Sequence, residues 1–265
     1  DPAPPKTKLA LFSAEQDLGE AGVASGVTSI GVASLLPAGR AALALIPPRV
    51  DAGFRVFKWK VGVEDIADEL ALLDDVCAAL PAGAKLRLDA NGAWDRRRAE
   101  RWLERCAERP VEYVEQPVAA DARGSADLML GLATDFPTVL ALDESIAGEA
   151  DLERWLGLGW PGVFVIKPLL LARPSIALAG LAKVQARVVF SSALETAVGA
   201  RAVLRQAFAW PGEPDGRGGR RQRALGVGVW PLFEDARCDG PAAAPFVRVE
   251  DVARMDPEVV WNALS

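Results

Sequence analysis

Short apolar runs alternate with longer amphipathic segments along most of the chain, with a repeat of roughly 25 to 30 residues. The short runs predict buried strands, whereas the longer segments 66–80, 96–108 and 193–209 show the periodicity of helices. The predicted strands cover residues 27–34, 54–61, 85–88, 111–114, 139–142, 163–166, 188–190 and 224–229. Eight strands that alternate with helices predict an α/β fold, a (β/α)8 barrel of the TIM type.

Charged and polar residues stand at the ends of these strands. Lys58 and Lys60 lie two positions apart in the second strand, so their side chains share one face while Trp59 points to the other. The next five strands are each followed directly by a side chain that can take part in chemistry, in the order Asp89, Glu115, Asp143, Lys167 and Ser191. Because the active sites of such barrels lie at the C-terminal ends of the strands, we expect these side chains to converge.

Three carboxylates at neighbouring strand ends would repel one another without a cation between them. The chain contains no histidine, which disfavours zinc, and hard oxygen ligands favour Mg²⁺, with Mn²⁺ as a second choice. A metal held by Asp89, Glu115 and Asp143 could bind a small-molecule carboxylate substrate while a lysine removes the proton next to that carboxylate. Without histidine, proton transfer falls to lysine or carboxylate groups.

Five short motifs carry a family resemblance, and they occur in the order Lys58-Trp59-Lys60, Asp89-Ala90-Asn91, Glu115-Gln116-Pro117, Asp143-Glu144-Ser145 and Lys167-Pro168. Together they resemble the enolase superfamily, specifically its muconate-lactonising branch, over residues 27–230. Within that branch, the segments 35–39 and 191–196 are similar to those of the o-succinylbenzoate synthases of the cyanobacterial type. The resemblance implies a barrel covered by an N-terminal α+β capping domain, most of which is missing from this chain.

The resemblance also implies an activity and a role for each matched residue. The reaction would be the syn-dehydration of 2-succinyl-6-hydroxy-2,4-cyclohexadiene-1-carboxylate to o-succinylbenzoate, a step of menaquinone and phylloquinone biosynthesis. Asp89, Glu115 and Asp143 would hold Mg²⁺. Lys60 would abstract the proton and return it to the departing hydroxide, while Lys167 would stabilise the enolate from the opposite face.

Five further residues would support this chemistry. Lys58 would assist at the substrate carboxylate, and Asn91 would support the metal-binding residues from two positions beyond a ligand. Glu144 faces away from its neighbour in an extended chain and so would act behind the ligands. Ser191 and Ser192 would hold the succinyl carboxylate with the backbone amides of the following helix. Ser192 with a glutamate three positions later also fits a capping box, and both interpretations are open.

Two other functions fit the same residues. An N-succinylamino acid racemase or a dipeptide epimerase would use the two lysines as opposed acid and base groups. Against this, residues 168–170 lack the Gly-Gly of many racemising relatives, and residues 225–228 lack an Asp-x-Asp that could bind an α-ammonium. A non-catalytic binding barrel is a more distant alternative, because unused like charges at the strand ends would cost stability.

The chain divides into three predicted regions, a remnant of the capping domain over 1–23, the barrel over 24–235 and a C-terminal segment over 236–265. The first region holds a predicted helix over 8–18, and the last a final helix over 257–264. The loop 211–223 is rich in Gly, Pro and Arg, and its polar composition predicts a solvated surface insertion.

Composition and charge exclude several classes of protein. The 265 residues are 51% hydrophobic and 25% charged, typical of a globular protein, and the net charge of −6 argues against a nucleic-acid partner. No apolar run is long enough to predict a membrane span. Three cysteines without metal-like spacing and no visible signal peptide predict reduced thiols in a cytoplasmic protein. The oligomeric state is left open.

Overall fold

The computed structural model describes residues 27–214, 219–241 and 244–264. The predicted helix over 8–18 lies outside these residues. The chain divides into two compact units, and each is described by itself. Unit 2 consists of Ala33–Ala147 and Arg154–Val165, whereas unit 1 consists of Asp1–Val32, Gly148–Glu153 and Ile166–Ser265.

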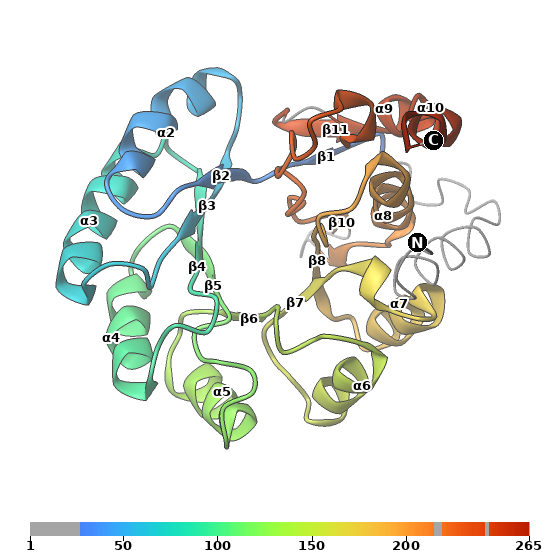
Figure 1. Cartoon of the computed structure of the whole chain (residues 1–265). Helices are drawn as coiled ribbons and strands as arrows, with labels where there is room; N and C mark the ends of the chain where they lie inside the picture. The colour runs from blue at the N-terminus through green and yellow to red at the C-terminus, as the bar shows by residue number, and fades with distance from the viewer. Residues whose placement is uncertain (1–26, 215–218, 242–243, 265) are drawn as a thin grey trace. The chain divides into compact units, whose positions relative to one another are not determined.

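The elements follow one another as Figure 1 labels them. The strands are β1 (Ser29–Gly31), β2 (Ser34–Leu36), β3 (Val56–Lys60), β4 (Lys85–Asp89), β5 (Val111–Glu115), β6 (Leu140–Leu142), β7 (Val163–Ile166), β8 (Arg187–Phe190), β9 (Glu213–Pro214), β10 (Arg220–Arg221) and β11 (Phe246–Arg248). The helices are α2 (Ala41–Asp51), α3 (Ile66–Ala79), α4 (Arg96–Cys106), α5 (Ser125–Asp135), α6 (Glu149–Gly157), α7 (Pro174–Lys183), α8 (Ala197–Ala209), α9 (Val249–Ala253) and α10 (Pro257–Leu264), with 3₁₀ turns η1 (Pro168–Leu170) and η2 (Ala236–Cys238).

A parallel sheet with the strand order β2-β3-β4-β5-β6-β7-β8 confirms the predicted barrel-type α/β fold. Within unit 2, helices α2 to α5 lie along one face of the strands (Figure 1). The pairing register places Lys60 beside Asp89 and Asp89 beside Glu115. Three side chains of the predicted site therefore start from neighbouring positions at the carboxyl ends of three adjacent strands.

The first and last predicted strands are corrected. Residues 27–34 do not form one strand, because β1 pairs antiparallel with β11, whereas β2 pairs parallel with β3. The run 224–229 is reduced to two isolated bridges, from Leu225 to Val32 and from Gly226 to Ser191. Glycines at 226 and 228 weaken a strand at this place, and a Cβ at Gly226 would lie 2.8 Å from Ser191 Oγ.

Helices α3 and α4 begin where predicted and end one and two residues early, whereas α2 and α8 differ from the predictions. Helix α2 was not predicted, and it contains Pro47 and Pro48, residues that normally interrupt a helix. Helix α8 begins at Ala197 after the N-cap residue Thr196, four residues later than predicted. Helix α10 occupies its predicted range, 257–264.

The core of unit 2 lies between its strands and its helices. Trp59 of β3 and Trp102 of α4 are fully buried, with their ring centroids 6.3 Å apart, and Trp94 stacks on Trp102 at 5.0 Å. Such aromatic pairs contribute about 0.5–1.5 kcal/mol beyond the area that they bury. Because side chains alternate along β3, burial of Trp59 against the helix layer turns Lys58 and Lys60 to the opposite face of the sheet.

The loop over 211–223 is less solvated than predicted in its described part. Strands β9 and β10 pair antiparallel, and the Glu213 side chain is buried and paired with Arg223. Arg220 donates to the backbone oxygens of Pro211 and Gly212. Polar side chains can be buried when opposite charges pair. Composition alone does not predict such pairing.

The C-terminal segment packs on unit 1, to which it belongs. Strand β11 pairs with β1, and Ala197 of α8, Cys238 and Val260 of α10 form a small buried cluster. Across the described ranges, the structure holds no helix that is long and apolar enough to cross a membrane.

Candidate active site

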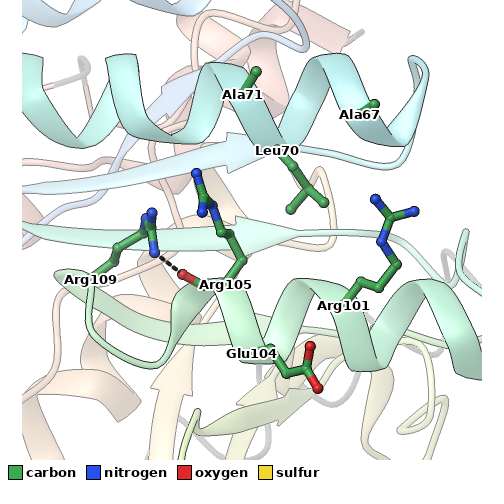
Figure 2. A pocket seen from close by; sticks show the side chains of 7 residues that line it. All are labelled: Ala67, Leu70, Ala71, Arg101, Glu104, Arg105 and Arg109. Atoms are coloured by element: carbon green, nitrogen blue, oxygen red, sulfur yellow. Dashed lines mark hydrogen bonds between the residues drawn. The ribbon is translucent and has the colours of Figure 1, made fainter.

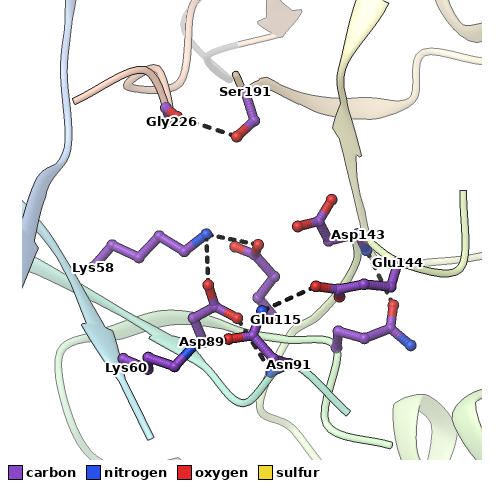
Figure 3. A network of polar contacts seen from close by, with 10 residues as sticks. Lys58, Lys60, Asp89, Asn91, Glu115, Asp143, Glu144, Ser191 and Gly226 are labelled. Atoms are coloured by element: carbon purple, nitrogen blue, oxygen red, sulfur yellow. Dashed lines mark hydrogen bonds and ion pairs between the residues drawn. The ribbon is translucent and has the colours of Figure 1, made fainter. Parts of the chain in front are cut away.

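Three charged side chains of unit 2 meet at the carboxyl ends of β3, β4 and β5. The Lys58 ammonium lies 2.8 Å from Asp89 Oδ2 and 2.7 Å from Glu115 Oε1 (Figure 3). The side chains are 14%, 13% and 1% exposed. The structure thus brings two of the three predicted metal-binding carboxylates together around one cation, which here is an ammonium.

Burial and charge act against each other in this cluster. Burial alone would lower the pKa of Lys58, but the carboxylates of Glu115 and Asp89 raise it above its ordinary value. Burial raises the pKa of Glu115, an effect that Lys58 opposes and that Asp89 and Asp143 increase. Lys58 is therefore held as the charged ammonium, and its positive charge allows the two carboxylates to lie side by side.

Lys60 belongs to a second chain of contacts in unit 2. Its ammonium donates to Asn91 Oδ1, and Asn91 Nδ2 donates to Glu144 Oε1 at 2.9 Å (Figure 3). The Asn91 backbone amide also donates to Asp89 Oδ1 at 3.2 Å. Asn91 has a left-handed backbone with φ of 43°, a conformation in which asparagine is enriched. Asn91 and Glu144, both predicted to act behind the ligands, thus connect Lys60 with the loop after β6.

Gln116 fixes the backbone that carries Asp143. Its Oε1 accepts from the amides of Asp143 and Ser145 at 3.1 Å each, while its Nε2 donates to Val118 O and Ser145 Oγ. The side chain is fully buried and uses both its donor and its acceptor capacity. No role for Gln116 was predicted from the sequence. The sequence offered one signal for a role of Gln116, which is that it directly follows the predicted ligand Glu115 in the motif Glu115-Gln116-Pro117.

In unit 1, Ser191 bonds to a distant segment of the chain, whereas Ser192 bonds within its own loop. Ser191 Oγ donates to Gly226 O at 3.1 Å (Figure 3). Ser192 Oγ donates to Glu195 Oε2 at 3.0 Å and accepts from the Leu194 amide at 2.9 Å. Because α8 begins at Ala197, the capping-box interpretation of Ser192 is wrong, and these bonds close a loop before the helix. Burial raises the pKa of Glu195, while nearby hydrogen bonds and the charge of Lys167 lower it.

The donor chemistry of unit 2 fits a magnesium ion. Asp89 Oδ2 and Glu115 Oε1 already converge on one point, and carboxylate oxygens are the ligands that Mg²⁺ prefers. As the side chains lie, the described residues contain no group of three or more His, Cys, Asp and Glu arranged to hold a metal. An ion in the place of the Lys58 ammonium would require movement of Lys58. The three-ligand assignment stays a prediction.

The sequence pattern also did not predict a buried charged side chain, Arg87, in the strands that carry the cluster. Arg87 pairs with Lys58 on one side and with Tyr113 on the other in the strand register. Its Nε donates to Glu112 Oε2 at 2.7 Å, and its guanidinium lies 5.0 Å from the Tyr113 ring. The register shifts between Leu86 and Arg87. Such an irregularity is invisible in the hydrophobic pattern.

A separate groove of about 600 Å³ lies between α3 and α4 (Figure 2). It is lined by Ala67, Leu70, Ala71, Arg101, Glu104, Arg105 and Arg109. No predicted site residue lines this groove. Arg105 and Arg109 both pair with Asp74, which offsets part of the positive charge of these two groove residues.

Comparisons with known proteins agree with this geometry. Residues 42–215 match the family model described as enolase C-terminal domain-like. Over 185 residues the chain is 44% identical to an o-succinylbenzoate synthase of Thermosynechococcus vestitus, an alignment that covers 68% of this chain and 56% of that protein. It is 37% identical over 109 residues to a hydrophobic dipeptide epimerase of Roseobacter litoralis, with 40% of this chain and 31% of that protein covered. The chain thus spans little more than half the length of the synthase.

A solved structure of an o-succinylbenzoate synthase is also similar to this chain. The crystal structure of o-succinylbenzoate synthase from Thermosynechococcus elongatus BP-1, complexed with Mg in its active site, superposes with a TM-score of 0.72 at 34% identity. The superposition covers 98% of this chain and 76% of that chain. These matches confirm the resemblance predicted from the five sequence motifs.

Proposed function

Since the chain belongs to the enolase C-terminal domain-like family, we propose that this protein is a Mg²⁺-dependent o-succinylbenzoate synthase, a hydro-lyase. Its substrate would be 2-succinyl-6-hydroxy-2,4-cyclohexadiene-1-carboxylate, dehydrated in the cytoplasm during menaquinone or phylloquinone biosynthesis. The carrying observation is the convergence of the Asp89 and Glu115 carboxylates on one cation position at the strand ends beside Lys60. Similarity to the Thermosynechococcus synthases supports the same choice of reaction.

Lys60 is the proposed base. It ends β3, and its amine is held by Asn91 at the carboxyl end of the sheet. In a syn-dehydration it would remove the proton next to the substrate carboxylate and return that proton to the hydroxide as the hydroxide leaves. One amine would then perform both proton transfers, and water would be the second product.

Asp89, Glu115 and Asp143 would hold the magnesium ion. When bound, Mg²⁺ would supply positive charge that stabilises the enediolate form of the substrate. Lys58, displaced from the two carboxylates, would be free to bind the substrate carboxylate. The carboxylates of Glu115 and Asp89 now raise the pKa of Lys58 above its ordinary value, and the substrate carboxylate would replace them as the negative partner that keeps Lys58 cationic.

Three residues of unit 1 complete the proposal. Lys167 would contribute positive charge to the developing enolate. Ser191 and Ser192 would bind the succinyl carboxylate by exchanging their present acceptors, Gly226 O and the Glu195 carboxylate, for substrate oxygens. The bonded backbone of Ser191, whose amide donates to Ile166 O at 2.9 Å, keeps this serine beside the end of β7.

The direct test is conversion of the cyclohexadiene by purified full-length protein, followed by the appearance of o-succinylbenzoate. Turnover is expected with Mg²⁺ and should disappear in EDTA and in Lys60→Ala. Lys85→Ala serves as the control, because Lys85 is an exposed lysine at the other end of the neighbouring strand. Absence of Mg²⁺-dependent turnover by wild type would contradict the proposal.

A racemase or epimerase of acylated amino acids or dipeptides is the second candidate. The match to a hydrophobic dipeptide epimerase favours it, and the same two lysines could serve as opposed acid and base. N-succinyl amino acids run beside the cyclohexadiene in the same assay decide between the two. Faster inversion of the amino acids than dehydration of the cyclohexadiene would select the racemase.

A further inference from the structure

Glu69 binds the turn of chain that follows the strand carrying Lys60. It lies in the first turn of α3 and is 1% exposed. Its Oε2 accepts from the Gly62 amide at 2.8 Å, and its Oε1 accepts from the amides of Val63 and Glu64 at 3.0 and 3.1 Å. One buried carboxylate therefore satisfies three consecutive backbone donors directly after β3.

Hydrogen bonds from backbone amides compensate the negative charge of the buried Glu69 carboxylate. Throughout the described ranges, the hydrogen bonds to this carboxylate come from these three amides, and no basic side chain pairs with it. A buried carboxylate is costly unless hydrogen bonds compensate for lost water, and the positive end of α3 adds to that compensation. An apolar side chain would fill the same space without this cost. The loop geometry that the carboxylate imposes explains why this buried position holds a carboxylate and not an apolar side chain.

The loop 62–64 leaves little room for another path. Gly62 has φ of 80°, and a Cβ there would lie 2.8 Å from Ala93 Cβ and 3.1 Å from Trp94 Nε1. On the other side, the Val61 amide donates to Asp89 O at 2.9 Å. The loop is thus pressed against the segment after β4, and Glu69 holds it there from the helix side.

We propose that Glu69 is a positioning residue for Lys60, an inference that rests on the proposed role of Lys60 as the base. The direction of the last residues of β3 depends on where the chain goes next, and three bonds to Glu69 determine that path. Without them the end of β3 frays, and the Lys60 amine leaves its place at Asn91 Oδ1. Glu69 touches no reacting atom in this account.

Two substitutions distinguish the effect of the three hydrogen bonds from the effect of the space that the Glu69 side chain fills. Glu69→Leu keeps a side chain of similar size and removes all three bonds. Glu69→Gln keeps an acceptor for Val63 and Glu64 but places an amide donor against the Gly62 donor, so one bond is lost. The control pair is Glu100→Leu and Glu100→Gln on α4, where the carboxylate pairs with Arg96 and is partly exposed.

Hydrogen exchange of the backbone amides gives the first readout. In Glu69→Leu the amides of 62–64 should exchange at least roughly tenfold faster than in wild type, with the amides of β4 unchanged. Glu69→Gln should show the change mainly at Gly62. Both Glu100 variants should leave these amides unaltered. If Glu69→Leu fails to fold, Glu69→Gln alone carries the test, with faster exchange at Gly62 expected.

The second readout is the position of Lys60, measured without catalysis. Acetic anhydride should label Lys60 several-fold faster in the Glu69 variants than in wild type, because the amine is released from Asn91, with labelling of Lys85 as the internal standard. Unchanged labelling in a variant whose 62–64 amides exchange faster would overturn the inference. This result is independent of whether the protein dehydrates the cyclohexadiene.

Turnover gives the third readout. In an active protein, Glu69→Leu should lower kcat roughly tenfold to hundredfold through misplacement of the base, with KM nearly unchanged, and Glu69→Gln should lie between. An unchanged kcat together with released amides would also overturn the inference. If wild type itself shows no dehydration, the proposed function fails, while the exchange and labelling results still decide the role of Glu69.

Discussion

The polar residues at the strand ends of unit 2 and those that follow β8 in unit 1 are held in different ways. In unit 2, Lys58, Asp89 and Glu115 come from three adjacent strands, and the contacts of Lys58 with the two carboxylates cross sequence separations of 31 and 57 residues. In unit 1, Ser192 and Glu195 bond within one loop. Strand register fixes the first arrangement, whereas local turn geometry fixes the second.

This difference predicts different responses to mutation. The unit 2 cluster contains opposite charges that depend on one another at low exposure, so removal of one member leaves another uncompensated. The unit 1 residues are two buried neutral hydroxyls and one partly buried carboxylate that bond to backbone groups and to each other, so removal of one hydroxyl leaves no opposite charge uncompensated. Large effects on stability and metal binding are expected in unit 2, and small ones in unit 1.

The largest effect is expected for Asp89→Asn, which removes a proposed metal ligand and one of the two acceptors of Lys58. Activity of the full-length protein should fall by at least about a thousandfold, since a bound metal contributes several kcal/mol of charge stabilisation. Calorimetric titration should show weaker Mg²⁺ binding in the same variant. Activity lost with unchanged Mg²⁺ affinity would remove Asp89 from the ligand set.

Lys58→Met should give the next largest effect, on folding in the absence of metal. Loss of the ammonium leaves two carboxylates facing each other, at a cost of about 3–5 kcal/mol in the free energy of unfolding. Urea unfolding in EDTA measures this, with the exposed Lys85→Met as control. Adding Mg²⁺ should restore most of the lost stability.

A double variant sharpens this result. Lys58→Met combined with Glu115→Gln removes both charges of one pair and should be more stable than Lys58→Met alone. If Lys58→Met costs less than about 1 kcal/mol, the cluster is no more coupled than a surface pair, and the comparison with unit 1 fails.

Ser191→Ala should have a smaller effect on stability. It removes the hydrogen bond to Gly226 O, worth about 1 kcal/mol in the free energy of unfolding. In the proposed enzyme it should raise KM more than it lowers kcat, because the serine binds a remote carboxylate. Thermal unfolding and steady-state kinetics check the two parts. A collapse of kcat with KM unchanged would place Ser191 at the reacting centre instead.

The smallest effect is expected for Glu195→Gln, and it depends on pH. Burial raises the pKa of Glu195 in the folded state, and Oε1 is buried without a hydrogen-bond partner in the described part of the chain. A raised carboxyl pKa stabilises the fold below the unfolded value, about 4.3, and this contribution is lost as the pH rises. The stability of wild type relative to Glu195→Gln should therefore fall between pH 4 and pH 7. A rise over that range would contradict the assignment.

The sequence predicted the strand ends better than the contacts made there. The regular spacing of Lys60, Asp89 and Glu115 after apolar runs predicted that all three lie at the carboxyl ends of their strands. This was possible because the length of a strand and the length of the repeat can be read from the local sequence. That the Lys58 ammonium lies between two carboxylates depends on strand register and side-chain rotation. The face of Lys58 was predictable from alternation with Trp59, and its partners were not.

Other features depended on backbone detail. The late start of α8 turned the Ser192 capping box into a loop, and glycines at 226 and 228 reduced the last strand to isolated bridges. Gln116 and Glu69 bind backbone amides that lie close only after folding. Residue type and spacing alone do not distinguish these two side chains from other polar residues on the same segments.

The central claim, that Lys60 is the sole base of a syn-dehydration, is tested most directly by isotope exchange in D₂O. Wild type should incorporate deuterium at the carbon next to the substrate carboxylate, Lys60→Ala should not, and Lys167→Arg should retain exchange and some turnover because arginine preserves the charge. A racemase needs Lys167 to gain and lose a proton, which arginine does not do. Exchange that persists in Lys60→Ala, or turnover abolished by Lys167→Arg, would contradict the account.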